Sequence, residues 1–195
     1  MVIRKTRVPV SVSAYFAGML ALCFAAGTAR QICLGLGFAA LHELGHLAAL
    51  KQSGGRPSRI CLTAAGMRIE RPPGLALGFG QEIAIAAAGP AVSLLLAGLF
   101  AVPAFFFSRP LSPEPCLLNL GFGLFNLLPV RQLDGGRMLY YALCRRMEEP
   151  VADRVVLAAG LVCLFVVVLL AGLSALRQGL SMPLVVMAVY LAACV

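Results

Sequence analysis

Leu41-His42-Glu43-Leu44-Gly45-His46-Leu47 lies inside an apolar run, Ile32–Leu50, that is long enough to form a membrane-spanning helix. This stretch contains the only two histidines of the chain. Residues four apart on a helix lie about 40° apart around its axis and about one turn apart in height, so both imidazoles can reach one metal ion. The glutamate that follows the first histidine is placed to take a proton from a water molecule at that ion. The stretch therefore favours a zinc hydrolase site over a chance pair of helix histidines.

The composition places this stretch in a membrane protein. The chain is 61% hydrophobic and 12% charged, with a mean hydropathy of +0.92. A soluble domain has about twice that charged fraction. The net charge of +8 is interpreted as an orientation signal in the membrane, and no nucleic-acid partner is expected. The seven cysteines are scattered without C-x-x-C spacing, which is typical of small buried apolar residues rather than of a disulfide framework or a metal cluster.

Six apolar segments predict an all-α polytopic membrane protein with about six transmembrane helices. They are Val8–Gly27, Ile32–Leu50, Ile83–Phe107, Cys116–Pro129, Val155–Leu173 and Leu180–Val195. The sixth segment is short and has Pro183 near its start, so whether it crosses the membrane fully stays open. The basic N-terminus before a full-length first segment favours an uncleaved signal anchor over a cleaved signal peptide. A single transmembrane domain over residues 1–195, with no separate soluble domain, is the expected organisation.

The basic residues between these segments predict the orientation of the chain. Thirteen of the sixteen fall before the first segment, between the second and third, or between the fourth and fifth. The other three are Arg30, Arg109 and Arg177. Because cytoplasmic loops are enriched in lysine and arginine, both termini are expected in the cytosol. The second and fourth segments then both end at the cytosolic face, which places the histidine stretch near that face.

A catalytic zinc ion usually takes three protein ligands, so a carboxylate must join the two histidines. Most acidic residues lie in loops beside basic residues or prolines, where a solvated charge is the ordinary interpretation. Asp134 differs, because it follows the broken fourth segment at the depth of the histidines, where a carboxylate is costly unless it is paired or binds metal. The alternative is a Gly135-Gly136 turn with Asp134 as a helix cap or as a partner of Arg137. Glu82, at the start of the third segment, is the weaker candidate ligand.

Two motifs together resemble the site-2 protease family of intramembrane zinc metalloproteases. They are H-E-L-G-H over residues 42–46 and the stretch 126–136, Asn-Leu-Leu-Pro-Val-Arg-Gln-Leu-Asp-Gly-Gly. The compact layout is similar to the bacterial sporulation branch, which processes a pro-sigma factor. The resemblance implies one Zn²⁺ ion held by His42, His46 and Asp134, Glu43 as the catalytic glutamate, and Asn126 as a contact to substrate or to a polarised carbonyl.

The same resemblance implies a catalytic core over about residues 31–146 and an active site near the cytosolic face of a bacterial cell membrane. It also implies a membrane-protein substrate, such as a membrane-tethered regulator, and a regulatory membrane partner. The family carries a Gly-x-x-x-Asn/Ser/Gly element that Gly89 and Ser93 match, although close helix packing explains this spacing equally well.

The loop between the second and third segments has an alternating pattern. Residues 59–63 and 67–70 alternate in polarity around Ala64-Ala65-Gly66, which favours a short β-hairpin. The resemblance suggests a strand here that pairs with unwound substrate. An ordinary amphipathic loop is the alternative.

Two other functions compete with proteolysis. A transporter or proton pathway could use intramembrane carboxylates such as Glu43 and Asp134, but it leaves the histidine spacing unexplained. A catalytically silent scaffold is the second alternative, and the intact Glu43 argues against it, because a protein without catalysis has no need of the base.

Overall fold

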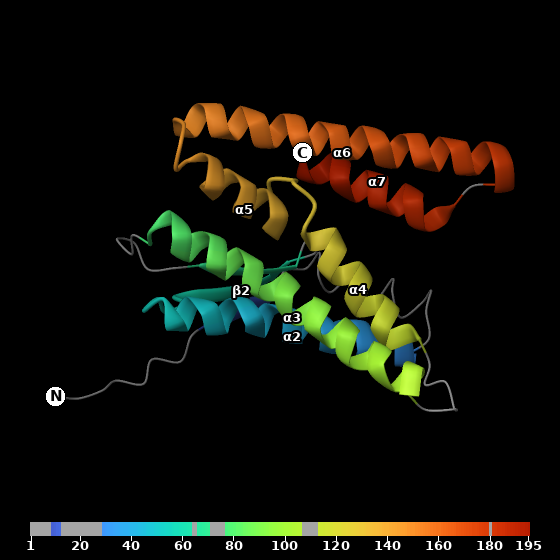
Figure 1. The fold of residues 1–195 in the computed structure, drawn as a ribbon, viewed down its shortest axis with the longest axis horizontal. Helices are drawn as coiled ribbons and strands as arrows, with labels where there is room; N and C mark the ends of the chain where they lie inside the picture. Colours follow the sequence, from blue (N-terminus) through green and yellow to red (C-terminus); the bar gives the residue numbers. More distant parts are fainter. Residues whose placement is uncertain (1–8, 13–28, 64–65, 71–76, 107–112, 180) are drawn as a thin grey trace.

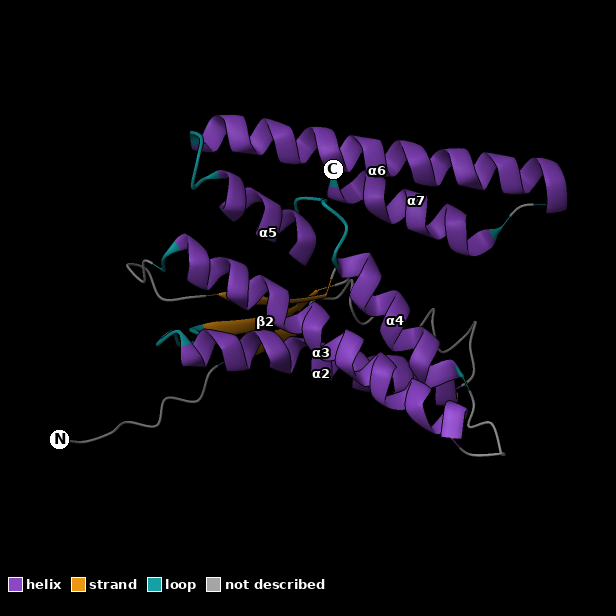
Figure 2. Ribbon diagram, in the orientation of Figure 1, coloured by secondary structure: helices purple, strands orange, loops and turns teal. Residues whose placement is uncertain are grey.

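The computed structural model describes residues 9–12, 29–63, 66–70, 77–106, 113–179 and 181–195 (Figures 1 and 2). The helical fold predicted from the apolar segments is confirmed. The elements in chain order are β1 (Val10–Val12), α2 (Ala29–Gln52), β2 (Arg59–Thr63), β3 (Gly66–Glu70), α3 (Phe79–Phe106), α4 (Glu114–Asn126), α5 (Asp134–Leu143), α6 (Glu149–Gln178) and α7 (Met182–Cys194).

Three of the described helices are long and apolar enough to cross a membrane. They cover Arg30–Gln52, Phe79–Val102 and Glu149–Arg177. At about 1.5 Å per residue, the shortest of them is about 35 Å long, more than the hydrocarbon core of a bilayer requires. Their outer faces carry large exposed apolar side chains, such as Leu95 and Phe165. Such faces suit a lipid environment and make the chain an integral membrane protein.

Helices α2 and α3 pack side by side, and α4 lies across α3 (Figure 1). Gly45 allows α2 to approach α3 at the height of the histidines. A Cβ atom at this position would lie 2.7 Å from the carbonyl oxygen of Ala88, closer than real side chains come. The absence of a side chain between the two histidines therefore brings both of them against α3.

The fourth apolar segment is broken, and its continuation forms α5. Helix α4 ends at Asn126, and α5 begins at Asp134 after an irregular stretch that contains Pro129. The Gly135-Gly136 turn considered as an alternative is not found, because both glycines lie in the first turn of α5. A Cβ at Gly135 would overlap the carbonyl oxygen of Leu127, and one at Gly136 would overlap that of Val130. These glycines therefore allow a close backbone approach rather than a turn.

The break packs against the last two helices. Val130 and Leu133, both fully or almost fully buried, form a core cluster with Leu191 and Cys194 of α7 and Val167 of α6. Helix α7 has 13 residues and is therefore about 20 Å long, shorter than the hydrocarbon core.

Arg131 connects the break to its neighbours. Its guanidinium pairs with the carboxylate of Asp153 in α6 and lies over the ring of Tyr140 in α5, 4.6 Å from the ring centroid. Together with the apolar cluster, this contact holds the stretch before Asp134 in place.

A small sheet is formed by β2 and β3, which lie between α2 and α3 along the chain, and by β1, which precedes α2. Strand β2 pairs antiparallel with β3 and parallel with β1, with Val10 opposite Ile60 and Arg59 opposite Glu70. The predicted start of the first membrane segment at Val8 is therefore wrong, because Val10–Val12 is a strand. Alternating β-branched residues there favour a strand, which mean hydropathy alone cannot distinguish from a helix. The remainder of that segment, residues 13–28, lies outside the described residues.

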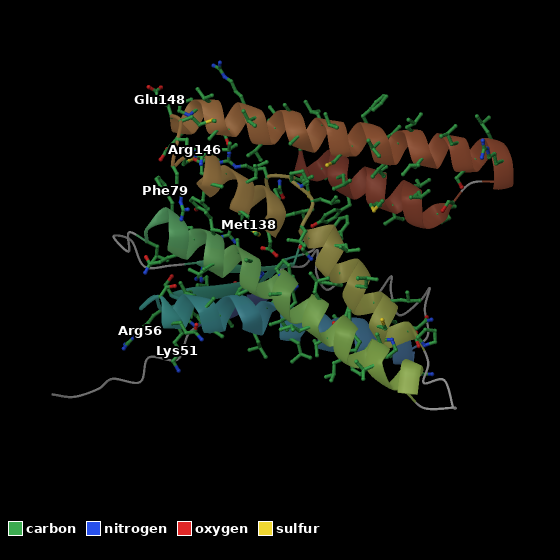
Figure 3. The ribbon with its side chains drawn as sticks, in the orientation of Figure 1. Lys51, Arg56, Phe79, Met138, Arg146 and Glu148 are labelled. Carbon is green, nitrogen blue, oxygen red and sulfur yellow. The ribbon has the colours of Figure 1, made fainter. Side chains whose placement is uncertain are left out.

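Charged side chains gather at one end of the helices. Lys51, Arg56, Arg146 and Glu148 all lie where α2 and α5 end and where α3 and α6 begin (Figure 3). At the opposite end of α2, Arg30 pairs with Glu114, with 3.7 Å between the nitrogen and the oxygen. The contact between Arg30 and Glu114 places the first residues of α2 and α4 at the same end, so the two helices run in the same direction.

Candidate metal site

His42 and His46 project from α2 into the protein rather than toward lipid. Their exposed fractions are 2% and 6%, although the helix around them is largely exposed. A buried imidazole needs partners for both of its nitrogens. Each histidine finds one partner on α3: Nδ1 of His42 lies 2.9 Å from Oγ of Ser93, and Nδ1 of His46 lies 2.7 Å from the carbonyl oxygen of Ile85.

The remaining nitrogen of each ring converges on one carboxylate. Oδ2 of Asp134 lies 3.1 Å from Nε2 of His42 and 3.2 Å from Nε2 of His46. The two Nε2 atoms are themselves 3.2 Å apart. Asp134 is the first residue of α5 and is itself buried. Three potential ligand atoms from α2 and α5 thus form a nearly equilateral triangle.

This triangle requires a cation. The carbonyl of Ile85 can only accept a hydrogen bond, so Nδ1 of His46 must carry the proton and donate it. In the neutral ring, Nε2 then presents its lone pair to the carboxylate of Asp134 at 3.2 Å. Two electron-rich atoms at that distance are stable in a buried site only with a proton or a metal ion between them.

The geometry fits a zinc ion. Tetrahedral zinc with bonds of about 2.0–2.1 Å places neighbouring ligand atoms about 3.3 Å apart, close to the distances found here. Two imidazole nitrogens and one carboxylate oxygen are a ligand set that catalytic zinc sites use. Gly89 of α3 keeps the space clear, because a Cβ at this position would overlap Nε2 of His46 and lie 2.6 Å from Nε2 of His42.

The structure does not show the two alternative roles considered for Asp134, a pair with Arg137 and a helix cap. Within the described residues, Asp134 pairs with the two histidines and not with Arg137. Leu133 rather than Asp134 occupies the N-cap of α5. Glu82 is buried on the face of α3 that carries Gly89, but it lies seven residues, or about 10 Å of helix rise, before it and is not among the three converging residues.

The other two residues singled out from the sequence are not among the three converging residues. Glu43 is half-buried on α2, directly after His42. Asn126 is the last residue of α4 and donates a hydrogen bond from Nδ2 to the carbonyl oxygen of Phe122, 3.0 Å away. The ring of Phe122 packs edge-on against His42, with 5.7 Å between the ring centroids.

Ser93 is the main residue whose role the sequence left open. The Gly89-x-x-x-Ser93 spacing was visible, but close packing explained it equally well. In the structure both explanations hold, because Gly89 makes room for the imidazoles and Ser93, which is 1% exposed, contacts His42. With a zinc ion bound at Nε2, Nδ1 of His42 would carry the proton and donate it to the Ser93 hydroxyl, which would fix the orientation of the ring.

We expect Ser93→Ala to weaken zinc binding by about 10- to 100-fold, because His42 then loses the hydrogen bond that orients it. Competition with a chelator of known affinity measures the change. Ser53→Ala is the matched control, because Ser53 bonds only the carbonyl of Ala49, at the end of α2 away from the site. Unchanged affinity in Ser93→Ala would mean that packing alone orients His42.

Comparison with known proteins agrees with this geometry. Residues 115–170 match the family model for peptidase family M50, a range that includes Asp134 but not the histidines. A zinc metalloprotease of Methanocaldococcus jannaschii is 33% identical over 113 residues, which cover 54% of this chain and 32% of that protein. A relative named as zinc metalloprotease Rip3, from Mycobacterium tuberculosis, is 30% identical over 165 residues, covering 77% of this chain and 36% of that protein. The chain thus spans about a third of the length of these relatives.

The fold has a solved counterpart. The site-2 protease from Methanocaldococcus jannaschii superimposes with a TM-score of 0.70 at 23% sequence identity, covering 99% of this chain and 91% of that one. At this identity the likeness establishes the fold. The family match, the named relatives and this fold together confirm the resemblance that the two motifs suggested.

Proposed function

We propose that this chain, which carries a peptidase family M50 domain in the fold of a site-2 protease, is an intramembrane zinc metalloprotease. Its reaction is the hydrolysis of a peptide bond in or near a transmembrane segment of a membrane protein. The observation that carries this proposal is the convergence of His42, His46 and Asp134 at 3.1–3.2 Å from one another inside a membrane helix bundle. All three ligands fall within residues 31–146, the catalytic core expected from the resemblance.

The residues around the triangle can perform the remaining steps of hydrolysis. A zinc ion, when bound, supplies a Lewis acid that polarises the substrate carbonyl and lowers the pKa of water. The carboxylate of Glu43 takes the proton of the attacking water and returns it to the nitrogen of the leaving amine. Asn126 has a second N–H besides the one bonded to Phe122, and it can donate to the oxygen of the tetrahedral intermediate.

A substrate helix must unwind before this chemistry, because its amide groups are closed in internal hydrogen bonds. The break between α4 and α5 leaves irregular backbone beside Asp134, where an unwound segment can lie. Membrane-tethered regulators, including a pro-sigma factor, are the substrate class that the sporulation-type resemblance favours. The same resemblance favours a membrane protein that regulates this activity.

The proposal is tested by incubating the purified protein with candidate single-span membrane substrates, with and without a zinc chelator. Cleavage that stops with the chelator and returns with added zinc supports it. Transport of protons or ions in liposomes without any cleavage would favour the transporter instead. Zinc binding with neither cleavage nor transport would favour the scaffold.

We also propose that the end of the bundle carrying Lys51, Arg56 and Arg146 faces the cytosol of a bacterial cell. We expect Arg59→Cys, on a cysteine-free background, to resist an impermeant maleimide added to intact cells. Arg177→Cys, at the far end of α6, is expected to react. Labelling of Arg59→Cys from outside would reverse the orientation.

A further inference from the structure

An apolar groove runs along one face of α4. Its volume is about 320 Å³, within the range of small-ligand pockets. The described residues that line it are three and four positions apart, as expected for one helix face: Leu117, Leu118, Gly121, Phe122, Phe125 and Asn126. Gly121 leaves a gap in this face, because a Cβ added there would have no atom within 4 Å.

The groove connects to the metal ligands through Phe122. One side of this ring lines the groove, and the ring also packs against His42 at 5.7 Å between centroids. The end of the groove nearest the break is formed by Phe125 and Asn126. Asn126 adds a polar amide to an otherwise apolar wall. In the proposed function, this amide donates a hydrogen bond to the oxygen of the substrate carbonyl.

We infer that this groove is a specificity pocket that binds one large apolar side chain of the substrate, next to the bond that is cut. The inference rests on the proposed function. A peptide whose carbonyl reaches Asn126 extends its neighbouring side chain along α4, past Phe122 and toward the gap at Gly121. The apolar wall favours leucine or phenylalanine in this place over alanine or a charged residue.

The size of the pocket can be changed from both sides without touching a metal ligand. Gly121→Leu fills the gap, whereas Leu118→Ala enlarges the groove. Gly98→Leu is the matched control, because Gly98 is an exposed glycine of α3 that also has no atom within 4 Å of an added Cβ. Zinc content, measured on each purified variant, verifies that the metal site is intact.

The first test measures kcat/KM on a series of one membrane substrate, with alanine, leucine or phenylalanine on either side of the cleaved bond. Wild type is expected to prefer leucine or phenylalanine over alanine by about 10-fold or more at one of these positions. Gly121→Leu should remove the preference, Leu118→Ala should shift it toward the larger side chain, and Gly98→Leu should leave it unchanged. A preference that neither groove variant alters would overturn the inference.

The second test measures binding without turnover, so that a failure of the pocket and a failure of the proposed reaction can be told apart. The substrate carries a photoreactive phenylalanine analogue at the preferred position, and Glu43→Gln protein is used to trap it. Cross-links to residues 117–126 support the pocket even if the wild type cuts nothing, in which case the proposed reaction has failed. Cross-links confined to other helices, or a groove labelled by a photoreactive lipid that substrate does not displace, would overturn it.

Discussion

Asp134→Ala is expected to remove the zinc ion and, with it, all cleavage. The substitution deletes one of three ligand atoms and leaves two neutral imidazoles to hold a divalent ion. When a residue that only hydrogen-bonds a metal ligand is lost, the metal affinity falls by about 10- to 100-fold. Loss of the ligand itself should lower the affinity further. Metal content and chelator competition on the purified protein measure the effect. Asp134→Glu should keep part of the metal but lose about 100-fold in rate, because it displaces the ion by about 1 Å.

Two variants serve as controls for Asp134→Ala. Glu82→Ala should leave zinc occupancy unchanged, because Glu82 lies on α3 away from the three converging atoms. Arg137→Ala should also keep its zinc, because Asp134 pairs with the histidines and not with Arg137. Full occupancy in Asp134→Ala would show that the third ligand is misassigned. Misfolding of both Asp134→Ala and Arg137→Ala would point instead to a structural pair.

Glu43→Gln is expected to abolish cleavage while zinc stays bound. The amide keeps the size of the side chain but cannot accept the proton of the attacking water, a function that contributes about 10²- to 10⁴-fold in rate. Cleavage of a membrane substrate and metal content, measured on the same preparation, separate chemistry from binding.

Two results would contradict the role given to Glu43. Zinc lost together with activity would make Glu43 a ligand or a structural residue. Normal turnover would show that another group accepts the proton.

The two candidate histidine ligands could be predicted as a pair because helix geometry makes their spacing local, whereas the candidate Asp134 was singled out by its depth in the membrane and by the resemblance. His42 and His46 share a turn of one helix, and Asp134 is a carboxylate that a membrane tolerates only with a partner. The contacts of Ser93 and Ile85 could not be predicted, because they depend on how α3 packs against α2. One of them is a backbone carbonyl, which any residue supplies. Glu43 and Asn126 remain predictions, and so does the sporulation-type branch.

The helices could be predicted where an apolar run is long, as in α2, α3 and α6. Helix α5 was missed, because two glycines at its start are poor helix formers and only the packing of Leu127 and Val130 against them explains their place. The prediction that the first segment is helical from Val8 was wrong at Val10–Val12, where pairing with β2 makes the chain a strand. Pairing between distant segments cannot be read from the residues of either one.

The break between α4 and α5 also affects how the protein is held together. Two candidate ligands belong to α2, whereas the third belongs to α5, 92 positions after His42, and α5 is packed with α6. An ion held by all three would therefore cross-link distant parts of the chain. Because such an ion would bind the folded bundle and not separated helices, the free energy of folding would depend on the concentration of free metal. Metal supply would thus affect the stability of the folded protein as well as its chemistry.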